Sequence, residues 1–83
     1  MDQKNSLIVQ IGFEIANRRR LLGMSQEQLA FTAGLHRTYI SLVERGCKSP
    51  TITTLESIAA SLGVPASEIL KSAEDNVGKL AEG

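Results

Sequence analysis

The stretch Ser25–Gly46, SQEQLAFTAGLHRTYISLVERG, contains two short helical patterns joined by a tight corner at Gly34. Ser25 and Gln28 have the spacing of a capping box, in which each side chain satisfies a backbone N–H of the first helical turn. A glycine adopts positive φ at low cost, so Gly34 can end the first helix and redirect the chain into a second helix near Arg37. Two helices joined in this way are typical of a helix-turn-helix, which places its second helix in a DNA groove.

The second helical pattern has two unlike faces. Ile40 and Val43 are spaced by three and form an apolar face that has to be buried. The other face carries long donors and small hydroxyl groups, which reach base edges and phosphates without aromatic stacking. These residues are Arg37, Thr38, Ser41 and Arg45. We expect Gly46 to end this helix.

Three further helices are predicted outside this motif. The first extends from a cap at Asn5 or Ser6 to about residue 22, with Arg18 standing where its apolar stripe would continue. Its expected core stripe is Ile8, Ile11, Ile15 and Leu22. The next helix is capped by Thr51 and ended by Gly63. Its expected core stripe is Ile52, Leu55, Ile58, Ala59 and Leu62. The last helix opens at Val64-Pro65 and contributes Ile69 and Leu70 to the core.

Composition favours a single small all-α domain. The chain has 83 residues, of which 42% are hydrophobic and 4% aromatic, as suits a helical bundle packed by aliphatic side chains. We expect a flexible N-terminus over residues 1–6, a folded domain over 7–73, and a frayed or weakly helical tail over 74–83. This length leaves no room for a second, ligand-sensing domain, so no small-molecule ligand is expected.

The single cysteine, Cys47, cannot form an internal disulfide, and no apolar run has the length of a signal peptide or a membrane span. We therefore expect a cytoplasmic protein without a membrane partner. One histidine, one cysteine and no clustered carboxylates provide no catalytic or metal-binding constellation. The sequence thus predicts neither an enzyme nor a metal or cofactor site.

Charge is sorted along the chain although the net charge is zero. Residues 15–50 contain six basic and two acidic side chains, whereas residues 51–83 contain two basic and five acidic ones. The basic block coincides with the helix-turn-helix, as the electrostatic attraction to DNA requires.

Together with its flanks, the motif resembles the lambda-repressor-like (Cro and XRE) helix-turn-helix family over residues 7–73. The matching positions on the flanks are Gly12, Ile15, Arg19, Gly23, Pro50, Leu55, Ile58, Ala59, Leu62, Val64 and Leu70. Within the family, HRTYISLVERG is most similar to the small controller proteins of restriction–modification systems, which carry a similar Arg-Thr-Tyr-Ile-Ser run. The resemblance implies an all-α, five-helix lambda-repressor-like DNA-binding domain with its helix-turn-helix at about residues 26–46.

The resemblance also implies roles for single residues. It places Arg37, Thr38 and Leu42 at base contacts. It places Gln26, Tyr39, Ser41, Arg45 and Lys48 at phosphate contacts, and it has Gln26 brace the first residue of the recognition helix. Arg19 and Glu44 correspond to a partly buried, structural ion pair. An arginine such as Arg37 can donate two parallel hydrogen bonds to a guanine.

Several residues are open to more than one interpretation. Tyr39 suits either a phosphate contact or a partly buried aromatic with a satisfied hydroxyl. Arg18 and Arg20 suit either phosphate contacts or surface solubility, and His36 can cap the recognition helix, contact phosphate or do neither. Four apolar residues fall off the core stripes and suit either packing or a subunit interface. They are Phe13, Phe31, Val77 and Leu80.

The sequence thus predicts a sequence-specific, double-stranded-DNA-binding transcriptional regulator. One recognition helix spans too few base pairs for selectivity, so we expect a homodimer on a palindromic operator, paired through the apolar region from Ile52 to Leu70. RNA polymerase is a candidate partner. The alternative is a protein-interaction adaptor that keeps the fold without binding DNA, but such an adaptor has no use for a donor-rich recognition face.

Overall fold

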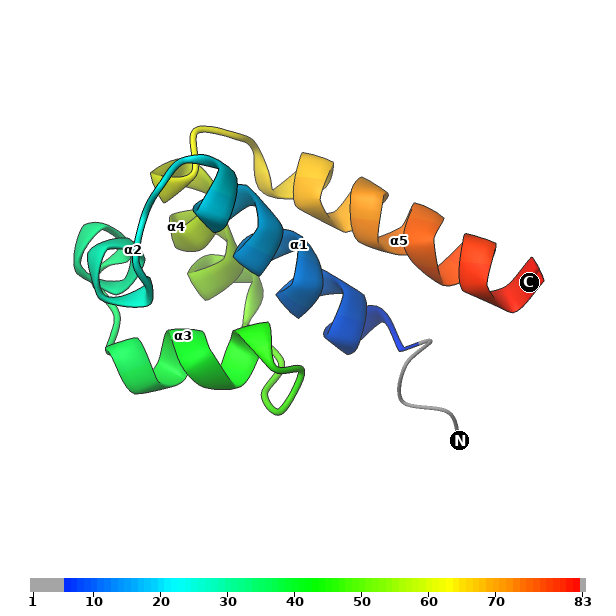
Figure 1. Cartoon of the computed structure of the whole chain (residues 1–83), viewed down its shortest axis with the longest axis horizontal. Coiled ribbons are helices and arrows are strands. Elements are labelled where there is room, and N and C mark those ends of the chain that lie inside the picture. The colour runs from blue at the N-terminus through cyan, green and yellow to red at the C-terminus, as the bar shows by residue number, and fades with distance from the viewer. Residues whose placement is uncertain (1–5, 83) are drawn as a thin grey trace.

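The structure is a computed structural model that describes the backbone of residues 6–82 and the side chains of residues 6–78. Within that range it contains five α-helices and no strand (Figure 1). The helices are α1 (Leu7–Leu21), α2 (Gln26–Ala33), α3 (Arg37–Glu44), α4 (Ile52–Ser61) and α5 (Ala66–Glu82). The predicted all-α, five-helix fold class is confirmed. Most of the N-terminal segment expected to be flexible, residues 1–5, lies outside the described residues.

Local sequence sets the starts of three helices. The Ser6 hydroxyl accepts a hydrogen bond from the Val9 N–H at 3.2 Å and caps α1. The predicted capping box of α2 is present, because Gln28 and Ser25 each accept the other's backbone N–H. Thr51 caps α4, as predicted. Each of these side chains satisfies an N–H group that the helix itself leaves unpaired.

The corner between α2 and α3 depends on Gly34, which ends α2 with a φ of 72°. At that φ an L-side chain is strained, so a glycine is required where the chain reverses direction this sharply. The next helix begins at Arg37 after His36, whose side chain makes no capping hydrogen bond. Of the three roles left open for His36, capping is therefore wrong.

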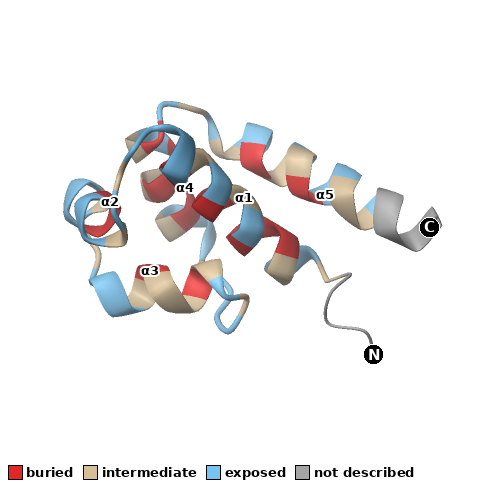
Figure 2. Ribbon diagram, in the orientation of Figure 1, coloured by how far each residue is buried: buried red, intermediate tan, exposed pale blue. Residues whose placement is uncertain are grey.

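Helix α1 lies at the centre of the bundle, packed against α3 on one side and α5 on another, while α2 packs on α3 and α4 (Figure 1). Figure 2 shows that the buried residues lie on the sides of the helices that face one another. The core consists of Ile11, Ile15, Leu29, Ala30, Ile40, Val43, Leu55, Ile58, Ala59, Leu62, Ile69 and Ala73.

Two of the predicted core stripes are partly wrong. Ile8 and Leu22 are 39% and 57% exposed, because Leu22 lies beyond the last residue of α1 and Ile8 lies in its first turn. The buried face of α1 includes the small residues Gly12 and Ala16 instead. In α4, Ile52 is the first residue and is 76% exposed, so it contributes nothing to the core.

Helix α5 continues through residues 74–82 to Glu82, the stretch for which the sequence predicts a frayed or weakly helical tail. Ala73 is fully buried, and the Asn76 side chain donates a hydrogen bond to the Glu14 carboxylate of α1 at 3.3 Å. These contacts hold α5 along α1 as far as Asn76. Val77 is partly buried, and the side chain of Leu80 lies outside the described residues.

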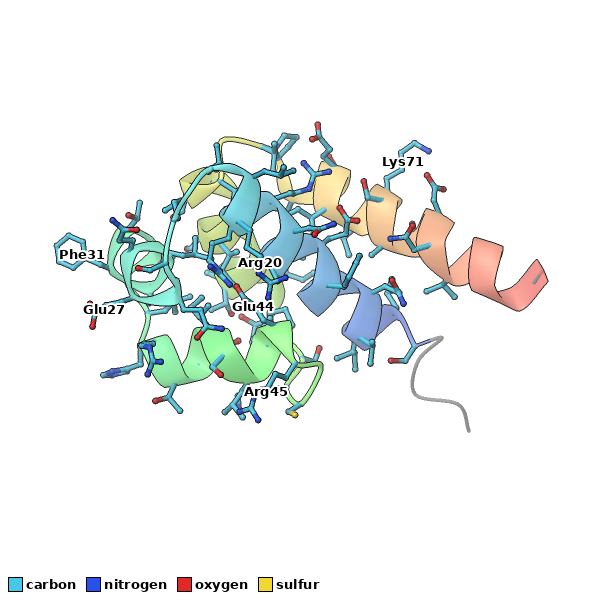
Figure 3. The ribbon with its side chains drawn as sticks, in the orientation of Figure 1. Arg20, Glu27, Phe31, Glu44, Arg45 and Lys71 are labelled. Carbon is cyan, nitrogen blue, oxygen red and sulfur yellow. The ribbon has the colours of Figure 1, made fainter. Side chains whose placement is uncertain are left out.

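The remaining apolar residues that fell off the core stripes are both exposed. Phe13 is 51% exposed on α1, and Phe31 is 88% exposed on α2, where it points away from the body of the molecule (Figure 3). Neither side chain belongs to the core. In the described part of the chain no helix has the length and apolar character needed to cross a membrane.

Candidate nucleic-acid interface

Helix α3 presents the polar face that the sequence predicted. Ile40 and Val43 are buried beneath it, at 0% and 1% exposure. Arg37 and Thr38 are exposed in its first turn, whereas Leu42 is half-buried. The two residues predicted to contact bases from the first turn are therefore exposed at the N-terminal end of the helix.

A glycine sets how closely α3 approaches α1. A Cβ atom added to Gly12 would lie 2.2 Å from the Val43 carbonyl oxygen and 2.8 Å from that of Glu44. No real Cβ atom tolerates such distances, and both obstacles are backbone atoms, which cannot rotate away. The last turn of α3 thus lies directly against the backbone of α1, and this contact fixes the distance between the two helices.

Arg19 and Glu44 form the ion pair that the family resemblance implied. Arg19 Nε donates to Glu44 Oε2 at 2.7 Å, and Arg19 Nη2 donates to Glu44 Oε1 at 3.0 Å. The two side chains are only 10% and 4% exposed, and Glu44 lies between α1 and α3 in Figure 3. Arg19 Nη1 also donates to the Met24 carbonyl at 2.8 Å. One guanidinium therefore joins α1, the loop before α2 and the end of α3.

The hydrogen bonds to Glu44 raise the pKa of the Arg19 guanidinium, and they outweigh the opposing effect of burial. A base whose pKa is higher in the folded state than in the unfolded state stabilises the fold fully at every pH below its unfolded-state pKa. This contribution is lost as the pH rises through the folded-state pKa. For a guanidinium this loss lies in the strongly alkaline range. The Arg19 guanidinium is thus charged throughout the physiological pH range.

Gln26 also bonds to this carboxylate, a contact that the sequence did not predict. Its Nε2 donates to Glu44 Oε1 at 2.9 Å. We expected Gln26 to brace the first residue of the recognition helix, but the residue it contacts is the last one. No local signal in the sequence pairs positions 26 and 44, because the contact exists only once α2 and α3 have packed together.

Apart from Gln26, the predicted phosphate contacts lie on α3 and in the segment that follows it. Arg45 and Lys48 are exposed, and Ser41 is half-buried. Arg45 Nε donates to the Ser41 carbonyl at 3.3 Å, and its side chain projects at the end of α3 in Figure 3. Tyr39 is half-buried, with its hydroxyl 3.5 Å from Thr54 Oγ1 and Lys48 Nζ 6.0 Å from its ring centre. Tyr39 therefore packs against the core and has a hydrogen-bonded hydroxyl, as one of its two interpretations predicts.

Arg18 points away from this surface toward α5. It donates to Glu14 at 3.2 Å, to Glu68 at 2.7 Å and to Ser72 at 3.2 Å. Of its two readings, a phosphate contact does not fit these bonds. The sequence held a weak signal for this arrangement, since Glu14 and Arg18 are four residues apart on one helix face. Arg20 is exposed.

Residues outside these contacts offer little further chemistry. Cys47 is a free, exposed thiol. Among the described residues, no three histidine, cysteine, aspartate or glutamate side chains gather in a way that would hold a metal ion.

The helix-turn-helix family model matches residues 15–69 of this chain, which include α2, α3 and α4. The chain belongs to the helix-turn-helix family. It is 49% identical over 47 residues to the control protein C.BamHI from Bacillus amyloliquefaciens, a match covering 57% of this chain and 58% of that protein. The chain thus matches little more than half the length of this relative.

Two solved structures of restriction–modification controllers are similar to this one. C.AhdI from Aeromonas hydrophila superposes with a TM-score of 0.73 at 34% identity, over 75% of this chain and 94% of that one. C.Esp1396I, solved as a tetramer with its natural 35 base-pair operator, gives a TM-score of 0.77 at 35% identity, over 86% and 93% of the two chains. The predicted resemblance to controller proteins of this family is confirmed.

Proposed function

We propose that this protein is a sequence-specific, double-stranded-DNA-binding transcriptional regulator of the controller type. The observation that carries the proposal is the exposed, donor-rich face of α3, whose opposite face is locked to the core through Gly12 and Glu44. Base reading needs donors held at fixed positions, and this arrangement provides them. The operator complex of C.Esp1396I adds support from a relative.

Within this interface Arg37 and Thr38 read base edges. Arg37 is exposed at the N-terminal end of α3, where an arginine reaches guanine O6 and N7 with two parallel hydrogen bonds. Leu42 is half-buried and supplies an apolar base contact. Arg45, Lys48, Ser41 and the Tyr39 hydroxyl hold the sugar-phosphate backbone on either side, which positions the helix without reading sequence.

The protein acts as a homodimer on a palindromic operator, paired through α4 and α5. Ile52 is 76% exposed and Leu70 is half-buried, so apolar surface is available on both helices. Residues 51–83 carry few positive charges, which suits a face turned away from DNA. Two-fold pairing sets half-site centres about 10 base pairs, or about 34 Å, apart, or a multiple of that distance.

The experiment that tests base reading is selection of bound sequences from a random duplex pool, followed by affinity measurements on the selected operator. Arg37→Ala should relax preference at one position per half-site by about 1–3 kcal/mol, whereas Arg45→Ala should weaken binding to all sequences alike. Arg37→Lys keeps the charge but not the planar fork, so it should also relax the preference. Uniform losses in all three variants would refute the assignment, and absence of duplex binding at low salt would favour the adaptor alternative.

Dimerisation is tested by sedimentation equilibrium of the wild type, Leu70→Glu and Ile52→Glu at micromolar concentration. A dimer that either charge converts to a folded monomer supports the proposed surface. Leu70 also packs against the core, so its variant needs a thermal melt as a check on folding. Ile52 is largely exposed and does not carry that complication. A wild-type monomer that binds one non-palindromic site tightly would contradict the model.

A further inference from the structure

The hydrogen bond between Gln26 and Glu44 joins the two helices of the helix-turn-helix at one point. Gln26 is the first residue of α2, and Glu44 is the last residue of α3. The bond from Gln26 Nε2 to Glu44 Oε1 measures 2.9 Å, and the same oxygen accepts from Arg19 Nη2 at 3.0 Å. The start of α2 is thus tied to the end of α3, opposite to the end that carries Arg37.

The Glu44 carboxylate needs these donors. Its side chain is only 4% exposed, and it lies at the C-terminal end of α3, where the helix dipole disfavours negative charge. Three N–H groups from Arg19 and Gln26 point at its two oxygens. Arg19 approaches from α1 and Gln26 from α2, so the end of α3 is held from two directions. Removing the Gln26 donor leaves the Glu44 carboxylate bonded to α1 alone, through Arg19.

We propose that Gln26 is a positioning residue that fixes the orientation of α3 on α2 through Glu44, and that it thereby sets how well Arg37 discriminates between bases. The proposal rests on the proposed function, because it takes α3 as the helix that reads DNA. It differs from a direct phosphate contact in what it predicts. A lost phosphate contact lowers affinity for every sequence, whereas a misplaced recognition helix lowers the preference for the operator over other sequences.

Two variants of Gln26 separate these roles. Gln26→Met has a similar length and no N–H donor, so it cannot hold Glu44. Gln26→Lys restores a donor and strengthens the bond to the carboxylate by adding a positive charge. Because Gln26 is neutral and half-buried, neither change strands a buried charge. Lys48→Met is the matched control, since Lys48 is exposed and expected to contact phosphate only.

The experiment measures the dissociation constants of the full chain for its selected operator and for a scrambled duplex of equal length. Gln26→Met should lower the operator-to-scrambled ratio about tenfold, with the scrambled duplex bound within about twofold of wild type. Gln26→Lys should keep the wild-type ratio. Lys48→Met should weaken both duplexes and leave the ratio unchanged. A circular-dichroism melt of each variant establishes that it is folded at the assay temperature.

Each outcome decides the proposal. Equal losses on both duplexes in Gln26→Met would overturn it and identify Gln26 as a phosphate contact. An unchanged ratio with unchanged affinities would overturn it as well. If the wild type shows no preference for any duplex, the proposed function fails. If the wild type has a strong preference and Gln26→Met retains it, only the proposal for Gln26 fails.

Discussion

Arg18 and Arg19 are neighbours on α1, yet their side chains serve different parts of the molecule. Arg19 enters the junction of α1, α2 and α3 and pairs with Glu44, at 10% and 4% side-chain exposure. Arg18 lies on the seam with α5 and pairs with Glu14 and Glu68, at 22%, 14% and 50% exposure. Both pairings raise the pKa of the arginine, Arg18 chiefly through its bond to Glu68.

The two sites differ in whether water can solvate a charged side chain that has lost its partner. When one partner of the Arg18 cluster is lost, solvent reaches the others, so the cost is small. When one partner of the Arg19–Glu44 pair is lost, the other charge stays buried without compensation. Two adjacent arginines, whose shortest bonds to a carboxylate both measure 2.7 Å, therefore contribute very differently to stability. Burial rather than distance separates them.

The largest expected effect follows from stranding the buried cation. Glu44→Ala should reduce the free energy of unfolding by about 3–5 kcal/mol, because Arg19 would remain buried without its partner. Thermal unfolding followed by circular dichroism measures this loss, with Glu56→Ala as the control at an exposed position of α4. Equal melting temperatures for the two variants would show that the junction tolerates the charge and would remove the contrast with Arg18.

The junction of α1 and α3 also depends on the close approach of their backbones at Gly12. Gly12→Ala places a methyl group 2.2 Å from the Val43 carbonyl and should cost roughly 1–3 kcal/mol, the range of an overpacked core. Gly78→Ala in α5 is the matched control, since a Cβ there meets nothing within 4 Å. An alanine favours a helix over a glycine, so the control should be stabilised by up to about 1 kcal/mol. Opposite signs in the two melts are expected, and a stabilised Gly12→Ala would refute the close approach of α1 and α3.

The smallest effect is expected at the α5 seam. Arg18→Met should cost about 1 kcal/mol, because each partly exposed pair contributes little and Glu14 keeps its bond from Asn76. Raising the salt concentration to about 1 M should shrink the difference from wild type, since solvent-exposed charges are then screened within about 3 Å. Lys71→Met, at a pair that is 79% and 58% exposed, should leave the melting temperature unchanged. A loss at Arg18 as large as that at Glu44 would end the distinction between the two sites.

Local signals explain why so much of the fold was predictable. The capping box at Ser25, the cap at Thr51 and the glycine corner at Gly34 act within four residues of themselves, and all are present in the structure. The exposed polar face of α3 likewise follows from the spacing of Ile40 and Val43. These features need no knowledge of how the helices pack.

The predictions that were wrong or missing concern features that depend on how the helices pack against one another. The buried face of α1 includes Gly12 and Ala16, and such small residues give no apolar signal in a hydrophobic stripe. Ile52 looks like a core residue by spacing but stands in the first turn of α4, where no helix covers it. The Gln26–Glu44 bond and the full length of α5 likewise depend on contacts between helices distant in sequence, so a local pattern cannot reveal them.

The attachment of α3 to α1 has a consequence for the order of folding. Helix α3 has eight residues, fewer than an isolated helix needs to be stable in water, and its last turn is held by Arg19 and Gly12 from a segment more than twenty residues earlier in the chain. We therefore expect α3 to become ordered only once α1 has packed against it. A peptide covering residues 25–46 alone contains every proposed base contact but none of the α1 scaffold. We expect that peptide to be unfolded on its own, because the helix-turn-helix takes its shape from contacts with the rest of the bundle.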